Sequence, residues 1–414
     1  MESLLVATKL RVPAPRSGLI GRARLMERLQ RGAGSRLVLV SAPAGFGKTS
    51  LVTQWLEAVA DHGHVVAWLA LDESDNRPGS FWPHLGAAIG AAVPGFGAGV
   101  LPLLESGGSP TEGMLASLVN ELDALSDELW LVLGDYHLID DQGIHAGVSY
   151  LLEHLPAQAH LLITTRADPP LPLARLRARG DLVEIRAADL RFTPEEASTY
   201  LNDVMGLELR PEDIVVLEAR TEGWIAALQL AALSMQGRDD VAGFIGGFTG
   251  NDRYIVDYLV EEVLARQPEP VRSFLLRTSI LEQLSGQLCD AVTADGASKT
   301  ILEKLDRSNL FVVPLDDRRQ WYRYHRLFAD VLRATSKRST ATRSQICITG
   351  RASGTSSTGS ALRRSATHSP VATWSERRHW SSLRFRSSAR RGKSCSCGHG
   401  WSHSPTRSSV AVQS

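Results

Sequence analysis

The stretch that decides the fold is Arg36-Leu-Val-Leu-Val-Ser-Ala-Pro-Ala-Gly-Phe-Gly-Lys-Thr49. Its first six residues form a short apolar run that is typical of a buried strand, and helical spacing of apolar residues begins at Lys48. The eight residues from Ala42 to Thr49 match the Walker A pattern, with alanine in the first glycine position. We therefore expect a phosphate-binding loop, and the alternative is a glycine-rich turn with a chance Lys-Thr pair.

Each residue type in this loop has a role in holding phosphate. Gly45 and Gly47 let backbone N–H groups face phosphate oxygens where a Cβ would crowd them, and the following helix adds its N-terminal dipole. Lys48 supplies positive charge to the β- and γ-phosphates, and the hydroxyl of Thr49 is a predicted ligand of Mg²⁺. The predicted nucleotide-contacting residues are Ala42, Pro43, Ala44, Gly45, Phe46, Gly47, Lys48, Thr49 and Ser50.

Four further apolar runs alternate with helical patterns after the first strand. The predicted strands are Arg36–Ser41, Val65–Leu71, Leu129–Leu133, His160–Thr165 and Leu182–Ile185. The predicted helices between them are Lys48–Ala60, Gly79–Ala92, Thr111–Leu125 and Gly143–Leu155. This alternation implies parallel strands with right-handed crossovers. We predict an N-terminal arm at 1–35, followed at 36–190 by an α/β domain of the P-loop NTPase fold, with a three-layer parallel sheet.

The strand signal largely stops after residue 190. Thr193-Pro-Glu-Glu196 is a strong helix start, with threonine at the N-cap and proline at the first helical position. We expect helices at Glu195–Met205, Pro211–Arg220, Trp224–Met235, Arg253–Ala265, Pro270–Leu276 and Lys299–Ser308, and a hairpin formed by Phe311–Leu315 and Gln320–His325. These patterns predict a helical lid domain at 191–250 and a winged-helix-like domain at 251–335.

Three more residues are candidates for the nucleotide site. Asp135 ends an apolar strand at the carboxyl edge of the sheet, where open α/β folds bind ligands; it is a candidate to hold Mg²⁺ or to polarise an attacking water, or else caps the strand. Arg166 follows a strand at the same edge and is a candidate catalytic contact to the γ-phosphate, or else a surface arginine. His325 lies among aromatic residues and is a candidate nucleotide sensor, or else a core residue.

Composition limits the remaining function classes. The sequence contains no run of about 18 consecutive apolar residues, so no membrane span is predicted. Its four cysteines are too few for a disulfide framework, and we therefore expect a cytoplasmic protein. The net charge of zero hides an asymmetry: from Lys337 onward there are 14 Lys and Arg against one acid, Glu376. Residues 336–414 are rich in serine and arginine without periodicity, and we predict a low-complexity basic tail that is disordered or read out of frame.

Nine motifs occur in the order in which they occur in MalT-type regulators. They are Thr8-Lys-Leu-Arg-Val-Pro13, Ser41–Thr49, Trp68-Leu-Ala-Leu-Asp72, Asp135-Tyr-His-Leu-Ile139, Thr165-Arg166, Leu190-Arg-Phe-Thr193, Glu222-Gly-Trp224, Tyr258-Leu-Val-Glu-Glu-Val263 and Tyr324-His-Arg-Leu-Phe328. The chain thus resembles LuxR-family transcription regulators that carry a STAND-class ATPase (signal transduction ATPase with numerous domains). The resemblance implies adenine specificity: ADP holds a closed monomer, and ATP with an inducer permits self-association. Any hydrolysis is expected to be slow.

The chain departs from this family in two places. The family's second motif ends in a pair of acidic residues. In this chain the first residue of that pair is Gly134 and the second is Asp135, so one of the two acids is missing. We therefore expect nucleotide binding with poor hydrolysis. Neither helical repeats nor a helix-turn-helix follow Thr335, so we expect a truncated switch that lacks the DNA-binding domain and does not bind DNA specifically. The alternative is a working ATP-dependent activator that contacts DNA through the basic tail. A kinase is disfavoured, because neither a His-Arg-Asp loop nor a Val-Ala-Ile-Lys strand is found.

Overall fold

The computed structural model describes residues 6–14, 18–32, 34–61, 63–104 and 111–338, which all lie within one structural unit. Its central element is a parallel sheet with the strand order β2-β3-β4-β1-β5. The strands are β1 (Leu37–Ser41), β2 (Val65–Ala70), β3 (Leu129–Gly134), β4 (Ala159–Thr165) and β5 (Leu182–Arg186). All five predicted strands are confirmed, with ends that differ by one residue at most.

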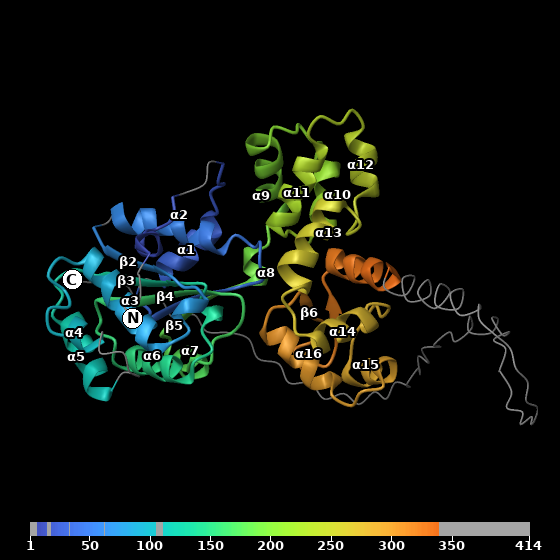
Figure 1. Ribbon diagram of the computed structural model, residues 1–414. Helices are drawn as coiled ribbons and strands as arrows, with labels where there is room; N and C mark the ends of the chain where they lie inside the picture. The colour runs from blue at the N-terminus through green and yellow to red at the C-terminus, as the bar shows by residue number, and fades with distance from the viewer. Residues whose placement is uncertain (1–5, 15–17, 33, 62, 105–110, 339–414) are drawn as a thin grey trace, which may run out of the picture. The chain divides into compact units, whose positions relative to one another are not determined.

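Helices cover both faces of this sheet and complete the predicted three layers (Figure 1). One face carries α1 (Ala23–Arg31) and α2 (Lys48–Asp61). The other carries α3 (Pro78–Ala92), α5 (Glu112–Asp123), α6 (Gln142–His154) and α7 (Leu173–Arg179). The shorter elements are α4 (Leu101–Leu104), η1 (Ala7–Leu10), η2 (Glu73–Asp75) and η3 (Tyr136–Leu138). Helix α1 lies inside the predicted N-terminal arm and was not expected from the sequence.

The strands divide their side chains between two apolar cores. Because successive side chains of a strand point to opposite faces, Val38 and Val40 of β1 join the core beneath α1 and α2. Leu37 and Leu39 join the core beneath α3, α5, α6 and α7. The strands are buried on both faces, which explains why they read as continuous apolar runs.

The helical region from residue 187 to 264 follows the sheet. It contains α8 (Ala187–Leu190), α9 (Pro194–Ser198), α10 (Pro211–Thr221), α11 (Ile225–Met235), α12 (Val241–Gly247) and α13 (Arg253–Leu259). Two predicted helices end in π-helical turns, η4 (Thr199–Val204) and η5 (Val260–Leu264). The predicted capping box is present: Thr193 Oγ1 accepts from the Glu196 N–H, and Glu196 Oε2 accepts from the Thr193 N–H.

The winged-helix region from residue 269 to 338 combines helices with a small hairpin. It contains α14 (Glu269–Thr278), α15 (Gly286–Thr293), α16 (Ser298–Arg307), and the antiparallel strands β6 (Val312–Pro314) and β7 (Tyr322–Tyr324). Residues 326–338 are helical, so the first three residues of the predicted tail continue a helix. The rest of that tail, 339–414, lies outside the described residues. Within the described part of the chain, no helix is long and apolar enough to cross a membrane.

Candidate functional site

The predicted phosphate loop connects the carboxyl end of β1 to the first turn of α2. Gly45 and Gly47 have φ angles of 75° and 77°, in the left-handed region that favours glycine. The Ala42 N–H donates to the Thr165 carbonyl at 3.2 Å, which fixes the start of the loop to the end of β4. The loop thus has the curled backbone and the helix N-terminus that phosphate binding requires.

Lys48 is buried at the base of this loop. Its ammonium donates to the carbonyl oxygens of Ala42 at 2.8 Å and Pro43 at 2.9 Å. Burial lowers the pKa of Lys48 to about 8; the positive charge of Arg166 acts in the same direction, and the negative charge of Asp135 opposes it. The lysine is thereby held inside the loop in a setting where its protonation responds to a bound anion.

Asp135 and Arg166, the two strand-end candidates, lie in the electrostatic neighbourhood of Lys48. Asp135 follows β3 in a left-handed conformation with φ 58°, and its N–H donates to Thr164 Oγ1 at 3.0 Å. Its carboxylate is half exposed, which leaves oxygen atoms accessible to a cation or water. The Arg166 guanidinium is 3.9 Å from Glu262 Oε2 in η5, so it connects the sheet edge to the helical region.

His137 is a neighbour of this group that the sequence did not single out as a site residue. Its Nδ1 lies 3.8 Å from Asp135 Oδ1 and forms no hydrogen bond with any described residue. Burial, together with the charges of Arg166, Lys48 and Arg266, lowers the pKa of His137 to about 3. A neutral imidazole therefore stands beside the strand-end acid. The motif Asp135-Tyr-His-Leu-Ile139 was the signal that could have pointed to it.

The outer side of the phosphate loop is packed against the helical region. Trp224 Nε1 donates to the Ala44 carbonyl at 3.2 Å, and the Ala226 N–H donates to the Gly45 carbonyl at 3.1 Å. A Cβ built at Gly45 would come within 2.6 Å of Ala226 and 2.9 Å of the Tyr258 hydroxyl. Glycine is therefore required here by this contact as well as by the positive φ angle.

An aromatic cluster continues this contact into the winged-helix region. Phe46 of the loop stacks on Trp224 at 6.3 Å and meets Phe311 at 6.2 Å between ring centroids, and Trp224 meets Phe311 at 5.0 Å. All three rings are buried. One apolar core therefore joins the phosphate loop to both later regions.

His325 lies behind that cluster and has no hydrogen bond to the loop among the described contacts. Its ring packs edge-on against Trp224 at 5.8 Å and Phe311 at 5.6 Å, and its Nε2 pairs with the Thr221 carbonyl at 3.0 Å. Burial lowers the pKa of His325 to about 4, so the imidazole is neutral at pH 7. Its Nδ1 is buried and forms no hydrogen bond with another described residue. The sensing role of His325 stays a prediction.

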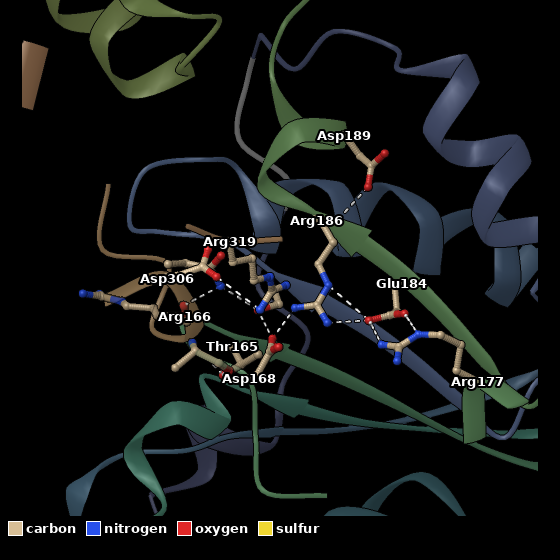
Figure 2. Close-up of polar contacts among 12 residues, drawn as sticks. Thr165, Arg166, Asp168, Arg177, Glu184, Arg186, Asp189, Asp306 and Arg319 are labelled. Carbon is tan, nitrogen blue, oxygen red and sulfur yellow. Dashed lines mark hydrogen bonds and ion pairs between the residues drawn. The ribbon is translucent and has the colours of Figure 1, made fainter. Parts of the chain in front are cut away.

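A polar network at the carboxyl edge of the sheet joins the same regions (Figure 2). Asp168, after β4, pairs with Arg186 and accepts from Ser41 Oγ at 3.3 Å, and its N–H donates to the Arg307 carbonyl at 3.1 Å. Asn309, at φ 48°, donates from Nδ2 to Ser41 Oγ at 3.0 Å and to the Arg166 carbonyl at 3.1 Å. Asn309 thus contacts the strand that leads into the phosphate loop.

A second polar contact, the Glu222–Arg323 clamp, joins the helical region to the winged-helix hairpin. The buried carboxylate of Glu222 accepts from both Nη atoms of Arg323 at 2.7 and 2.8 Å and from the Arg326 N–H at 3.0 Å. Arg191 approaches the same carboxylate at 3.3 Å. Burial alone raises the pKa of Glu222, but these hydrogen bonds and positive charges outweigh it and lower the pKa to about 2.

The residues present fit a nucleotide with Mg²⁺. Thr49 and Asp135 offer hydroxyl and carboxylate oxygens, the ligand type that Mg²⁺ prefers when it also keeps waters and phosphate oxygens. Within the described ranges there is no group of three His, Cys, Asp or Glu that could hold a metal by itself.

The loop after β1, the buried lysine and the strand-end aspartate define a P-loop nucleotide-binding fold. Residues 260–344 match the family model described as the MalT winged helix domain. The chain is 36% identical over 327 residues to serine/threonine-protein kinase PknK of Mycobacterium tuberculosis, covering 79% of this chain and 30% of that protein. It is 35% identical over 335 residues to the HTH-type transcriptional regulator MalT of Yersinia enterocolitica, covering 80% and 36%. The predicted resemblance to MalT-type regulators is confirmed, and the chain spans about a third of the length of these relatives.

Among solved structures, the chain is similar to Cdc6p from Pyrobaculum aerophilum, with 15% identity, a TM-score of 0.38, and coverage of 81% of this chain and 97% of that one. The Aeropyrum pernix ORC1 protein in complex with DNA gives 16% identity and a TM-score of 0.39, covering 78% and 93%. Likenesses this distant carry no argument about function.

Proposed function

We propose that this chain is the nucleotide-binding switch of a MalT-like transcription regulator, and that it binds ATP or ADP with Mg²⁺ at the loop Ala42–Thr49. The single observation that carries the proposal is the packing of this loop. Its backbone is contacted by Trp224 and Ala226 from the helical region, and Asn309 from the winged-helix region contacts the strand that leads into it. A change in what the loop binds can therefore change how the later regions are held.

Each site residue has a distinct part in this proposal. Lys48 leaves one or both carbonyl oxygens to contact phosphate, while Thr49 and Asp135 hold Mg²⁺ through oxygen atoms. Arg166 contacts the γ-phosphate, which is the group that distinguishes ATP from ADP. Because Arg166 also approaches Glu262, a contact to the γ-phosphate competes with its tie to η5.

The switching step is a difference in affinity between two arrangements of the later regions. A nucleotide shifts such an equilibrium only as far as it binds the two arrangements differently. The closed arrangement described here has loop contacts from Trp224, Ala226 and Tyr258 around Gly45. We propose that ADP is compatible with it and that ATP loosens it. Self-association and binding of an inducer are part of the same proposal.

Calorimetry with Mg·ADP and Mg·ATP tests the binding step. We expect binding by the wild-type chain and a loss of at least about tenfold in affinity for Lys48→Ala, because charge-assisted hydrogen bonds to phosphate are removed. Lys304→Ala, at an exposed position of α16, is the matched control and should bind as wild type. A folded wild-type chain that binds neither nucleotide contradicts the proposal.

A second experiment tests whether Gly134 limits hydrolysis. A Cβ at Gly134 would meet its nearest atoms, on Trp68 and β2, at 3.5–3.6 Å, which is ordinary contact, so the backbone leaves room for a side chain to begin there. We expect Gly134→Asp to hydrolyse ATP faster than wild type, and Gly134→Ala to remain slow. Equal turnover by all three chains would show that the missing acid does not limit the reaction.

The other functions considered from the sequence gain no support. DNA contact through the basic tail concerns residues 339–414, which lie outside the described residues. The name of the mycobacterial relative describes a protein kinase, but this chain spans 30% of that protein. Since the kinase loop and strand motifs are not found in this sequence, we propose no protein kinase activity for it.

A further inference from the structure

The winged-helix region contains a polar groove of about 690 Å³ that the nucleotide site does not use. Its walls are the start of α15, one face of α16, and the turn and second strand of the β6–β7 hairpin. Gly286 lets α15 approach α16 closely, since a Cβ there would lie 3.0 Å from the Lys299 side chain. The volume is within the range of pockets that hold small organic ligands, about 300–1,000 Å³.

The charged groups of this groove leave two arginines unpaired. Its acids lie near cations or donors: Asp306 lies 3.2 Å from Arg319, although its buried Oδ2 forms no hydrogen bond with a described residue, Glu303 lies 4.0 Å from Lys299, and Asp290 accepts from the Ser298 N–H at 3.1 Å. Within the described chain, no hydrogen bond or ion pair within 4.0 Å is found for the guanidinium groups of the lining residues Arg307 and Arg318, although the charge of Arg307 acts on the Asp306 carboxyl. The remaining charge of the groove is therefore positive and in the form that suits oxyanions.

The floor of the groove contains a hydroxyl without a hydrogen-bond partner. Tyr322 is only 2% exposed, and its OH forms no hydrogen bond with any described residue. Asp306 and Arg319 are its electrostatic neighbours, and burial raises the pKa of the Asp306 carboxyl. Buried hydroxyl groups are nearly always paired, because leaving one unpaired is costly. A polar group of a ligand would satisfy Tyr322.

We propose that this groove binds a small aromatic oxyanion. Its carboxylate or phosphate is held by Arg307 and Arg318, its ring lies against the exposed indole of Trp321, and a polar substituent reaches the Tyr322 hydroxyl. The proposal uses the two free cations, the unpaired buried hydroxyl and the aromatic rim at once, and these lining residues come from α16, the turn and β7.

The last turn of α16 connects the groove to the phosphate loop. Arg307 lines the groove, and its carbonyl accepts from the Asp168 N–H at 3.1 Å. Two residues later, Asn309 contacts Ser41 and the Arg166 carbonyl. A ligand that orders this turn should therefore change nucleotide affinity, and the nucleotide should change ligand affinity by the same factor. This coupling, unlike the groove itself, rests on the proposed nucleotide binding.

Saturation-transfer NMR and calorimetry on the full chain, without nucleotide, test the groove. The probes are 4-hydroxybenzoate, phenyl phosphate and the neutral analogue 4-hydroxybenzamide. We expect at least one of the two anions to bind and the amide to bind at least about tenfold more weakly, because the contact to arginine is lost. The stronger of the two anions then identifies carboxylate or phosphate as the preferred group.

Variants locate the binding. Arg318→Ala and Trp321→Ala should each weaken the preferred anion, Arg318→Ala by at least about tenfold, whereas Arg253→Ala on the exposed surface of α13 should not. Failure of both anions to bind at millimolar concentration, or equal binding by Arg318→Ala, overturns the proposal. Displacement of the probe by random duplex DNA also overturns it, in favour of a nucleic-acid surface.

A double titration separates the groove from the nucleotide site. Probe binding without nucleotide reports the groove alone, and Mg·ADP binding without probe reports the P-loop alone. If both bind but neither affinity changes in the presence of the other, the groove stands and its coupling through Arg307 and Asn309 is wrong. A reciprocal change that disappears in Asn309→Gly supports the coupling.

Discussion

The two faces of the parallel sheet differ in how far their apolar cores extend. Under α3, α5, α6 and α7, the core is closed: its buried members lie between Leu37 and Leu176, all within the α/β domain. Under α1 and α2, the core continues through Phe46, Trp224 and Phe311 and ends at Leu332 in the winged-helix region. The same five strands thus contribute to a local core and to a shared one.

This difference distinguishes side chains that only stabilise the α/β domain from side chains that also connect it to the later regions. A side chain in the closed core holds the sheet and its helices together, whereas a side chain in the shared core also holds the phosphate loop against two later regions. The loop residue Phe46 belongs to the shared core. We therefore propose that the shared face is where events at the proposed nucleotide site reach the rest of the molecule.

The largest effect is expected from removing one buried tryptophan on each face. Trp224→Ala and Trp82→Ala should each cost about 3–5 kcal/mol in free energy of unfolding, because both indoles are fully buried. Only Trp224→Ala should also separate melting into two transitions and speed proteolysis after residue 190. Calorimetry and limited proteolysis measure both. Two transitions in Trp82→Ala as well would remove the distinction between the faces.

The Glu222–Arg323 clamp is the polar counterpart of the shared core. Arg323→Ala leaves a buried carboxylate without its main partner and should cost about 3 kcal/mol. Arg210→Ala breaks an exposed pair with Asp213 and should cost less than about 1 kcal/mol. Urea unfolding compares the two. Similar losses would mean that Glu222 is not held as described.

The same clamp predicts an acid sensitivity. The pKa of Glu222 is lowered from 4.5 to about 2 in the folded chain, so its contribution is present above pH 4.5 and is lost as pH falls toward 2. Urea unfolding of Glu222→Gln should show a weaker dependence on pH across this window than wild type. An unchanged profile would assign the acid sensitivity to other carboxylates.

Nucleotide affinity should depend on pH through Lys48. Its pKa is about 8, and a bound phosphate favours the protonated form. Affinity for ADP should therefore be steady below pH 8 and fall by up to about tenfold per pH unit above it, with proton uptake on binding. In the core beneath α3, α5, α6 and α7, by contrast, burial raises the pKa of Tyr136 and lowers that of His145, so both side chains stay neutral and should not contribute to this pH dependence. Calorimetry in buffers of different ionisation enthalpy measures the proton uptake; its absence would contradict the assignment.

A smaller loss of stability than at Trp224 is expected at Asn309. Asn309→Ala loses two side-chain hydrogen bonds and also strains a residue with φ 48°, so it should cost about 1–3 kcal/mol. Asn309→Gly relieves the strain and loses only the hydrogen bonds. Both variants should release ADP faster than wild type in stopped-flow displacement. Wild-type release by Asn309→Gly would show that these hydrogen bonds do not hold the closed arrangement.

Much of the α/β domain was predictable, because both the strands and the loop are local signals. Strands buried on both faces appear as apolar runs, and the glycines of the loop are required by its own backbone. Helix α1 was missed because only Leu25 and Leu29 of its nine residues are buried, among four charged side chains. Helix α12 has three glycines in seven residues, so propensity opposes it and only the Asp240 cap favours it.

The cover of the loop was not predictable from local signals. Trp224, Tyr258 and Asn309 reach the loop or its strand from regions far along the chain, and nothing in their own segments indicates that contact. Asn309 adopts a left-handed conformation between α16 and β6. Asparagine tolerates this conformation, but the presence of an asparagine in the sequence does not predict it. Such contacts follow from tertiary packing, and sequence patterns of period 2 or 3.6 do not contain them.

The shared core also has a consequence for synthesis of the chain. The closed face can complete its core once residues up to β5 have left the ribosome. Phe46, by contrast, meets Phe311 only after most of the later sequence has been translated. At roughly 5–20 residues per second, the interval between the end of β5 and Phe311 is on the order of 6–25 seconds, during which the phosphate loop is formed but uncovered. A nucleotide bound in this interval would be in place before the regions that close over it exist.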